Sequence, residues 1–311
     1  MKRLFVAVAA FALAAGIASA QDMSAAVETF NMGAQTLEAN KAEALAQFKS
    51  ALTQFEACDA EEAAEMIAQC KKIIPQTMVS IAKEQINEAQ YDEALETLKE
   101  AAAVAEGYGQ EEIAADAKEL VPTAWSRKGA ALLKAKDFVG AAAAFKAVVT
   151  LTPEDGQNQL LYGQALMQAG DNAGAITALE AAAANGKAEQ ANKLLSNVYL
   201  KEGMALVKAN KSAEAITALE KANSFGESAN AYKLIASANT KLGKSKAAIE
   251  AYKKYLEIDP NAKDAADVMF TIAATAQKAG DKATAIEYYK KLSGNAKYAA
   301  QATQQLGALQ K

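Results

Sequence analysis

The sequence predicts an all-α protein built as a stacked array of helix–turn–helix hairpins. Three observations carry this prediction. The chain of 311 residues is 51% apolar but only 6% aromatic, and much of the apolar fraction is alanine, the best helix former. Its four prolines and 17 glycines are too few for the many turns of an all-β protein. A short pattern of small and large apolar residues also recurs along the chain, as in repeat proteins.

The recurring pattern begins with a small residue, followed four positions later by a large apolar one and usually by another apolar residue three beyond that. Spacings of four and three place all of these residues on one face of a helix. In one copy the residues are Ala215, Leu219 and Ala222. The copies centre on Ala44, Ala94, Ala141, Ala175, Ala215, Ala248 and Ala285.

A second helix is expected upstream of each copy. In one unit Trp125 and Gly129 precede Ala141 and Phe145, and Pro153 follows them. This pattern resembles the tetratricopeptide repeat, a 34-residue helix–turn–helix with Trp, Gly, Tyr, Ala, Phe and Pro at set places. The resemblance covers nearly all of residues 21–293 and implies a right-handed α-solenoid of about seven hairpins. The units start near positions 25, 75, 122, 156, 196, 229 and 266, and residues 294–311 are expected to form a capping helix.

Each position in the pattern has a physical role. Gly170, Gly243 and Gly280 are expected at hairpin turns, where a left-handed backbone is needed. The alanines let paired helices approach closely, and Trp125 and Phe145 are expected in the core. No hairpin can bury its apolar face alone, so the hairpins must stack.

The two longest units, which start near positions 25 and 75, each contain an acidic pair that precedes a proline. Glu61-Glu62 leads to Pro75, and Glu111-Glu112 leads to Pro122. We expect residues 60–73 and 110–121 to add helical turns ahead of each proline, which would be the first residue of a first helix. The added turns form either one long proline-containing helix or a separate short one. The glutamates fit a first helical turn, where negative charge is favourable.

The first 20 residues have the pattern of a signal peptide. Lys2 and Arg3 precede an uncharged, mostly apolar run from Leu4 to Ile17, and Ala18-Ser19-Ala20 forms a cleavage site before Gln21. The run is shorter than the roughly 20 residues that a membrane-spanning helix needs. We therefore expect an exported protein, periplasmic or secreted, without membrane insertion.

Composition narrows the classes of function. The net charge of −4 argues against nucleic-acid binding, which needs a basic surface. The chain has no histidine, which excludes histidine zinc sites and histidine-activated nucleophiles. A pair of acids could still act chemically, but the sequence predicts no catalytic residue, metal or cofactor.

The two cysteines, Cys58 and Cys70, are expected to form a disulfide in an oxidising compartment. Two reduced thiols are the alternative. A helix beginning at Asp59 would place Cys70 about 15 Å along its axis, beyond the roughly 7 Å between Cα atoms that a disulfide allows.

The resemblance also implies a concave groove lined by first helices. When the groove positions of the family are transferred to this sequence one by one, they are rich in lysine and apolar residues. Asp267 is the single acidic residue among them. Lysines near helix C-termini can instead complement the helix dipole, and the apolar members can be buried between neighbouring helices. The candidate partner-binding residues are Lys134, Leu160, Met167, Leu200, Met204, Lys208, Lys233, Lys241, Phe270 and Lys278.

These residues predict a non-enzymatic scaffold of the bacterial cell envelope that binds other proteins or peptide segments. The bound segments are expected to be acidic and to carry a few apolar anchor residues. A structural subunit that binds through its convex face or its ends is the alternative. Some family members bind a C-terminal carboxylate with Lys and Asn at fixed positions. Here Lys233 matches, but Ser237 and Thr271 do not, so that role is not expected. The oligomeric state is left open.

Overall fold

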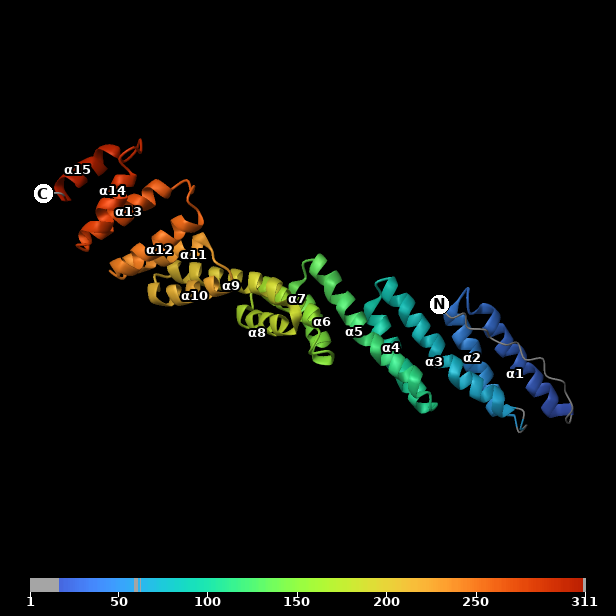
Figure 1. Ribbon diagram of the computed structural model, residues 1–311. Helices are drawn as coiled ribbons and strands as arrows, with labels where there is room; N and C mark the ends of the chain where they lie inside the picture. Colours follow the sequence, from blue (N-terminus) through green and yellow to red (C-terminus); the bar gives the residue numbers. More distant parts are fainter. Residues whose placement is uncertain (1–16, 59–60, 62, 310–311) are drawn as a thin grey trace. The chain divides into compact units, whose positions relative to one another are not determined.

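The computed structural model describes residues 17–58, 61 and 63–309, and all regular structure in these residues is helical. The helices form seven consecutive hairpins followed by a final helix, which confirms the predicted solenoid class (Figure 1). The first three hairpins are α1 (Ile17–Thr36) with α2 (Lys41–Glu56), α3 (Ala63–Asn87) with α4 (Tyr91–Gly107), and α5 (Glu111–Lys134) with α6 (Phe138–Leu151). The other four are α7 (Gly156–Ala169) with α8 (Asn172–Ala182), α9 (Ala188–Lys208) with α10 (Ser212–Phe225), α11 (Ala229–Lys241) with α12 (Ser245–Ile258), and α13 (Ala265–Lys278) with α14 (Lys282–Lys291). The final helix is α15 (Ala299–Leu309).

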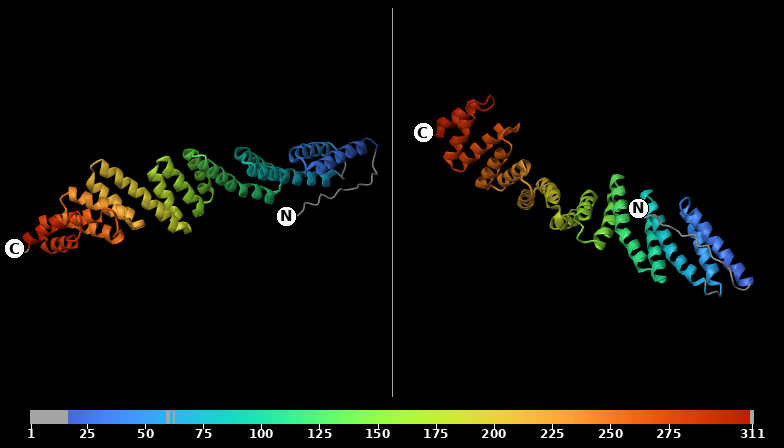
Figure 2. Two further views of the ribbon diagram at one scale, coloured as in Figure 1. Left: turned by 90° about the horizontal axis from the view of Figure 1, so that it is seen from above. Right: turned by 45° about the vertical axis from the view of Figure 1, so that its right-hand side comes forward.

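Packing divides the chain into two compact units, the first ending at Pro153 and the second beginning at Glu154. The first unit contains α1 to α6 and the second contains α7 to α15. Within each unit the two helices of a hairpin lie side by side, as the further views show (Figure 2). No described helix has both the length and the hydropathy needed to cross a bilayer. The predicted signal peptide lies, as far as residue 16, outside the described residues, and α1 begins at Ile17.

The two long hairpins each contain a proline within a continuous helix. Pro75 lies inside α3 and Pro122 inside α5, so the expectation that each proline begins a first helix is wrong. The added turns belong to the first helices themselves, as the long-helix alternative required. Glu111 and Glu112 lie in the first turn of α5, as expected, whereas Glu62 lies outside the described residues.

A third extension lies in the fifth hairpin, between the predicted unit starts near 156 and 196, which are further apart than 34 residues. Helix α9 begins at Ala188, ahead of the predicted unit start near 196. It follows a π-helical turn, Ala183–Lys187, in which Gly186 has φ of 83°. The local signal is Asn185-Gly186, a pair that favours a left-handed backbone and so separates α8 from α9.

Close helix contacts explain the small residues of the repeat. A Cβ atom built on Gly129 would lie 2.8 Å from Phe145 Cζ, and one on Gly203 would lie 2.5 Å from Leu219 Cγ. Ala141 and Phe145 are fully buried, as predicted. Trp125 is only partly buried, because it lies at the edge of the contact between α4 and α5.

Every hairpin turn except the one between α1 and α2 contains a left-handed residue. Gly170, Gly243 and Gly280 have φ of 90°, 70° and 80°, which confirms their predicted role. Equivalent turns in other hairpins place non-glycine residues in the same region, with φ of 63° at Ala89, 63° at Lys136 and 58° at Asn210.

Helix α15 covers the last hairpin as a cap. Tyr298, Leu306 and Leu309 pack against the core of that end of the chain, and Ala302 is fully buried. Gln277 Nε2 donates a hydrogen bond of 2.9 Å to Gln305 Oε1. The polar C-terminal segment therefore has the role that the sequence predicts for it.

Candidate functional site

The candidate groove residues of the second unit lie on the first helices of its hairpins. Consecutive first helices contact one another directly, α7 with α9 and α9 with α11. This continuity means that residues on neighbouring hairpins can contribute to one surface. Lys134 belongs instead to the first unit, where it is exposed in the last turn of α5.

The apolar candidates differ greatly in exposure. Leu160 is 8% exposed and belongs to the hydrophobic core, so it presents little surface to a partner. Met167 and Leu200 are partly buried against the same cluster. Met204 is 39% exposed. The apolar contact available to a partner is therefore centred on Met204, with the outer edges of Met167 and Leu200 beside it.

The lysine candidates also separate into two kinds. In the described part of the chain Lys208 and Lys278 are exposed and make no ion pair. Lys241 is exposed and donates a hydrogen bond of 3.3 Å to Asn210 Oδ1, in the turn after α9. Lys241 therefore helps to hold neighbouring hairpins together while its charge remains near the surface.

Lys233 is tied into the contact between the last two hairpins. Its Nζ donates to the Asp264 carboxylate and lies 5.5 Å from the centre of the Tyr255 ring. Tyr255 also donates its hydroxyl to Asp264. The hydrogen bonds from Lys233 and Tyr255 lower the pKa of Asp264. Burial, with the hydrogen bond to Asp264, raises the pKa of Tyr255 to about 12. The interactions of Lys233 are thus structural.

Phe270 lies beneath the C-terminal cap. Its ring stacks on Tyr298 with centroids 4.6 Å apart and meets Tyr289 edge-on at 5.9 Å. Asp267, the single acid of the predicted groove, pairs with Lys297 at 2.8 Å and accepts a hydrogen bond from Tyr298 at 2.9 Å. Phe270 is therefore a packing residue, and the negative charge of Asp267 is locally compensated.

Lys278 remains exposed on α13. Five other candidates remain available for binding in the second unit, and we call these five the first-helix surface. They come from α7, α9 and α11, and none of them is acidic. An acid-poor surface attracts acidic segments electrostatically. The first-helix surface consists of Met167, Leu200, Met204, Lys208 and Lys241.

The predicted disulfide stays a prediction. Cys58 Sγ donates to the carbonyl of Gln54 at 3.3 Å, and Cys70 is fully buried. Burial, with the nearby Glu56 carboxylate, raises the pKa of Cys70 to about 12, so its reactive thiolate is disfavoured. Asp59, the residue at which the alternative to the disulfide would begin a helix, lies outside the described residues. Thiol alkylation of the protein isolated from cells, with and without reductant, distinguishes the two states.

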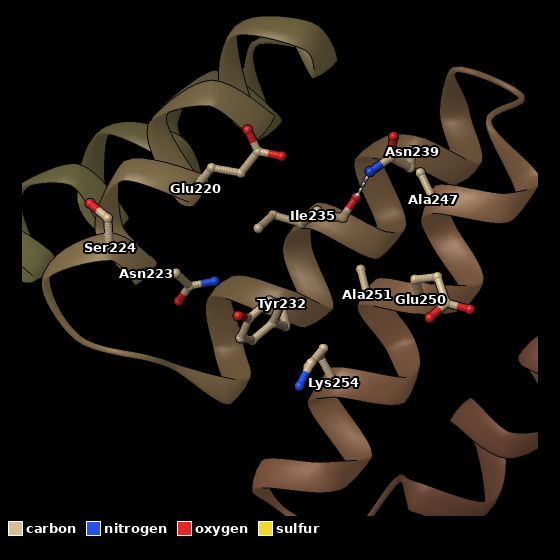
Figure 3. A pocket seen from close by; sticks show the side chains of 10 residues that line it. All are labelled: Glu220, Asn223, Ser224, Tyr232, Ile235, Asn239, Ala247, Glu250, Ala251 and Lys254. Atoms are coloured by element: carbon tan, nitrogen blue, oxygen red, sulfur yellow. Dashed lines mark hydrogen bonds between the residues drawn. The ribbon is translucent and has the colours of Figure 1, made fainter.

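Two hollows that the sequence analysis did not identify lie on the side of the second helices. One, of about 540 Å³, lies between α10 and α12 with α11 as its floor (Figure 3). The other, of about 570 Å³, lies in the first unit between α4 and α5. Residues from different hairpins form each hollow, so the pattern within one repeat gives no signal for it. The described residues contain no group of three metal-ligating side chains.

Comparison with known proteins supports the repeat assignment. Three models of the tetratricopeptide repeat match the chain, at residues 132–198, at 80–156 and 200–263, and at 267–297. No curated protein matches it.

Several solved structures are similar to the chain. A crystal structure of the MamA protein is 24% identical with a TM-score of 0.37, covering 59% of this chain and 96% of MamA. The tetratricopeptide repeat domain of P58(IPK) is 15% identical with a TM-score of 0.27, covering 92% of this chain and 97% of that domain. PilF of Pseudomonas aeruginosa is 12% identical with a TM-score of 0.34, covering 76% of this chain and 99% of PilF. The family models together span most of the chain from residue 80 to residue 297, and the chain therefore belongs to the tetratricopeptide repeat family.

Proposed function

We propose that the chain is an exported, non-catalytic scaffold of the cell envelope that binds acidic protein segments with apolar anchors on its first-helix surface. The general part of this function follows from the family, because tetratricopeptide repeats are protein-interaction modules. The proposal adds the compartment, the surface and the chemistry of the partner.

The observation that carries the proposal is the pairing of Met204 with Lys208 on α9. These residues are four positions apart and so share one helical face, and both are exposed. A flexible methionine beside a cation suits an amphipathic acidic segment. Exposed ion pairs contribute only about 0–1 kcal/mol each, so the apolar contact provides most of the affinity and the lysines increase the association rate.

Export is supported by the basic start, the short apolar run and the Ala-x-Ala site of the first 20 residues. Intact-mass measurement of the protein from the envelope fraction tests this part. We expect a mature chain that begins at Gln21. A mass that retains residues 1–20 would contradict export by cleavage of this signal.

Two variants test the surface against a partner isolated by crosslinking in intact cells. Met204→Ser should speed dissociation, because it removes the exposed apolar anchor. Lys208→Gln should slow association and weaken its dependence on salt, since charge acts over about 8 Å at physiological ionic strength. Val139→Ser is the matched control, because Val139 is 72% exposed but lies on α6 in the first unit. Unchanged kinetics in both test variants, with melting temperature preserved, would exclude this surface.

A structural role through the second helices or the ends of the solenoid remains the second candidate. The hollow between α10 and α12 favours it, because this hollow is concave, partly polar and open to a partner. Loss of partner binding on substitution in this hollow, with the Met204 and Lys208 variants unaffected, would favour this candidate.

A further inference from the structure

The hollow between α10 and α12 lies on the opposite side of α11 from the predicted groove. Tyr232, Ile235 and Asn239 of α11 line the hollow, whereas Lys233 and Lys241 face the groove by repeat position. At about 100° per residue, the two sets point to opposite sides of the helix. A ligand in the hollow would therefore not compete with one on the first-helix surface.

The hollow contains a buried hydrogen-bond donor without an acceptor. Asn223 Oδ1 accepts a hydrogen bond of 3.0 Å from the backbone N–H of Ser228, which fixes the orientation of the amide. Asn223 Nδ2 is buried and has no partner in the described residues, and Figure 3 shows it directed from α10 toward the Tyr232 side of the hollow. A buried donor left unpaired is unfavourable, so an acceptor brought by a ligand would stabilise the site.

Three charged side chains line the hollow, and the one that makes no ion pair in the described residues, Glu220, is negative. Lys254 is held by Glu257 at 2.9 Å, and Glu250 is held by Lys253 at 3.1 Å. Glu220 makes no ion pair or hydrogen bond within the part of the chain that the structure describes. Its carboxylate lies on the α10 side of the hollow, with the Ile235 side chain between it and Tyr232 (Figure 3).

The hollow of the first unit provides an internal comparison, because it occupies the same place in the repeat. Its charges are paired with each other, Lys99 with Glu96 at 3.4 Å and Lys118 with Glu106 at 2.5 Å. Taking Ala94 with Ala215 and Gly129 with Ala236 as equivalent, the second hollow has an acid in place of a lysine at one of four corresponding positions and a polar side chain in place of alanine at two. The correspondences are Lys99 with Glu220, Ala102 with Asn223, Ala103 with Ser224, and Trp125 with Tyr232.

We propose that the hollow between α10 and α12 binds an arginine side chain of a partner polypeptide. The guanidinium group pairs with Glu220 and lies against the Tyr232 ring, and the neighbouring backbone carbonyl accepts from Asn223 Nδ2. Arginine fits better than lysine because its planar group both stacks on an aromatic ring and donates several hydrogen bonds. The volume of about 540 Å³ accommodates this side chain with its backbone. The partner chemistry is thus opposite in charge to that expected at the first-helix surface.

Nuclear magnetic resonance titration of the full chain, labelled with ¹⁵N, tests the proposal. The probe is the blocked pentapeptide Ala-Ala-Arg-Ala-Ala. Two further peptides replace arginine with citrulline, which keeps the shape but removes the charge, or with glutamate. We expect the arginine peptide to shift the side-chain amide signals of Asn223, and the other two peptides to bind at least about tenfold more weakly, as expected for loss of a charged hydrogen bond.

Substitutions assign the effect to the hollow. Glu220→Gln should weaken binding of the arginine peptide about tenfold, and Glu96→Gln, in the corresponding hollow of the first unit, should leave it unchanged. Asn223→Ala should also weaken binding. If Asn223→Ala unfolds the chain through loss of the Ser228 contact, the Glu220→Gln variant still tests whether the peptide binds in this hollow, because Glu220 is exposed. Equal affinity for the arginine and citrulline peptides, tighter binding of the glutamate peptide, or full affinity in Glu220→Gln would each overturn the proposal. None of these outcomes bears on the first-helix surface.

Discussion

Close contact between a glycine of the first helix and a large residue of the second helix recurs in several hairpins. It joins Gly129 with Phe145 and Gly203 with Leu219. The glycines weaken the helices locally, by about 1 kcal/mol relative to alanine, but allow the backbones to approach. The pattern therefore encodes the distance between paired helices as well as their helicity.

Gly203→Ala should destabilise the chain by about 1–3 kcal/mol, because its Cβ would lie 2.5 Å from Leu219 Cγ in a closely packed core. Gly307→Ala is the control, since Gly307 also lies in a helix but has nothing within 4 Å of the added atom. Denaturant unfolding measures both. If both substitutions stabilised the chain alike, helix propensity rather than close packing would govern the Gly203 position.

The network of Lys233, Tyr255 and Asp264 predicts a pH-dependent stability. The pKa of Asp264 is lowered in the folded chain, so its contribution is present above the unfolded value of about 3.9 and is lost as pH falls through the lower folded value. Asp264→Asn should cost about 0.5–1 kcal/mol at pH 7, and the difference from the parent should shrink below about pH 4.

Unfolding curves of the parent and Asp264→Asn at pH 7, 5 and 3 test the predicted direction of this pH dependence. Asp116→Asn is the control, because Asp116 is exposed on α5 and makes no ion pair in the described residues. A difference that grows as the pH falls would contradict the assigned role of Asp264.

At the scale of the helices, the hairpin turns from the second hairpin onward each end the first helix with one left-handed residue, whereas the turn between α1 and α2 has none. The backbone N–H of Gly243 donates to Thr240, and that of the next residue, Lys244, donates to Asn239. Lys136 makes the same contact to Leu133. The hydrogen bonds are thus equivalent, but lysine has a Cβ atom that makes this conformation unfavourable.

Lys136→Gly should therefore stabilise the chain by about 0.5–1 kcal/mol, as relief of left-handed strain exceeds the entropy cost of glycine. Lys134→Gly, two residues earlier in the last turn of α5, should instead destabilise it by about 1 kcal/mol. Thermal unfolding of the pair measures the difference. Equal destabilisation by both changes would show that the φ of 63° at Lys136 carries no strain.

For the whole molecule, the local repeat pattern predicted the seven hairpins and the cap, because turns and close helix contacts depend on residues near one another in sequence. The extended start of α9 was missed, since the pattern was anchored on small residues further along that helix. Pro75 and Pro122 were misplaced because proline marks a helix start in sequence but is tolerated inside these long helices.

The candidate site was less predictable for a physical reason. Lys233 was selected by its repeat position, but its partner Asp264 belongs to the next hairpin. Phe270 is covered by Tyr298 of the cap segment. Whether a candidate residue is exposed therefore depends on contacts between neighbouring hairpins. The sequence pattern within a single repeat does not encode these contacts. The candidates that stay accessible, Met204 and Lys208, lie where no later segment covers α9.

The central claim is that a protein partner binds on the first-helix surface, and site-specific photocrosslinking in intact cells tests it most directly. A photoreactive phenylalanine analogue at Met204 samples this surface. The same analogue at Thr177, exposed on the second helix α8, samples the other side of the same unit. We predict a discrete crosslinked protein from position 204 that is absent from position 177. Crosslinking from position 177 with none from position 204, in chains that fold alike, would contradict the account.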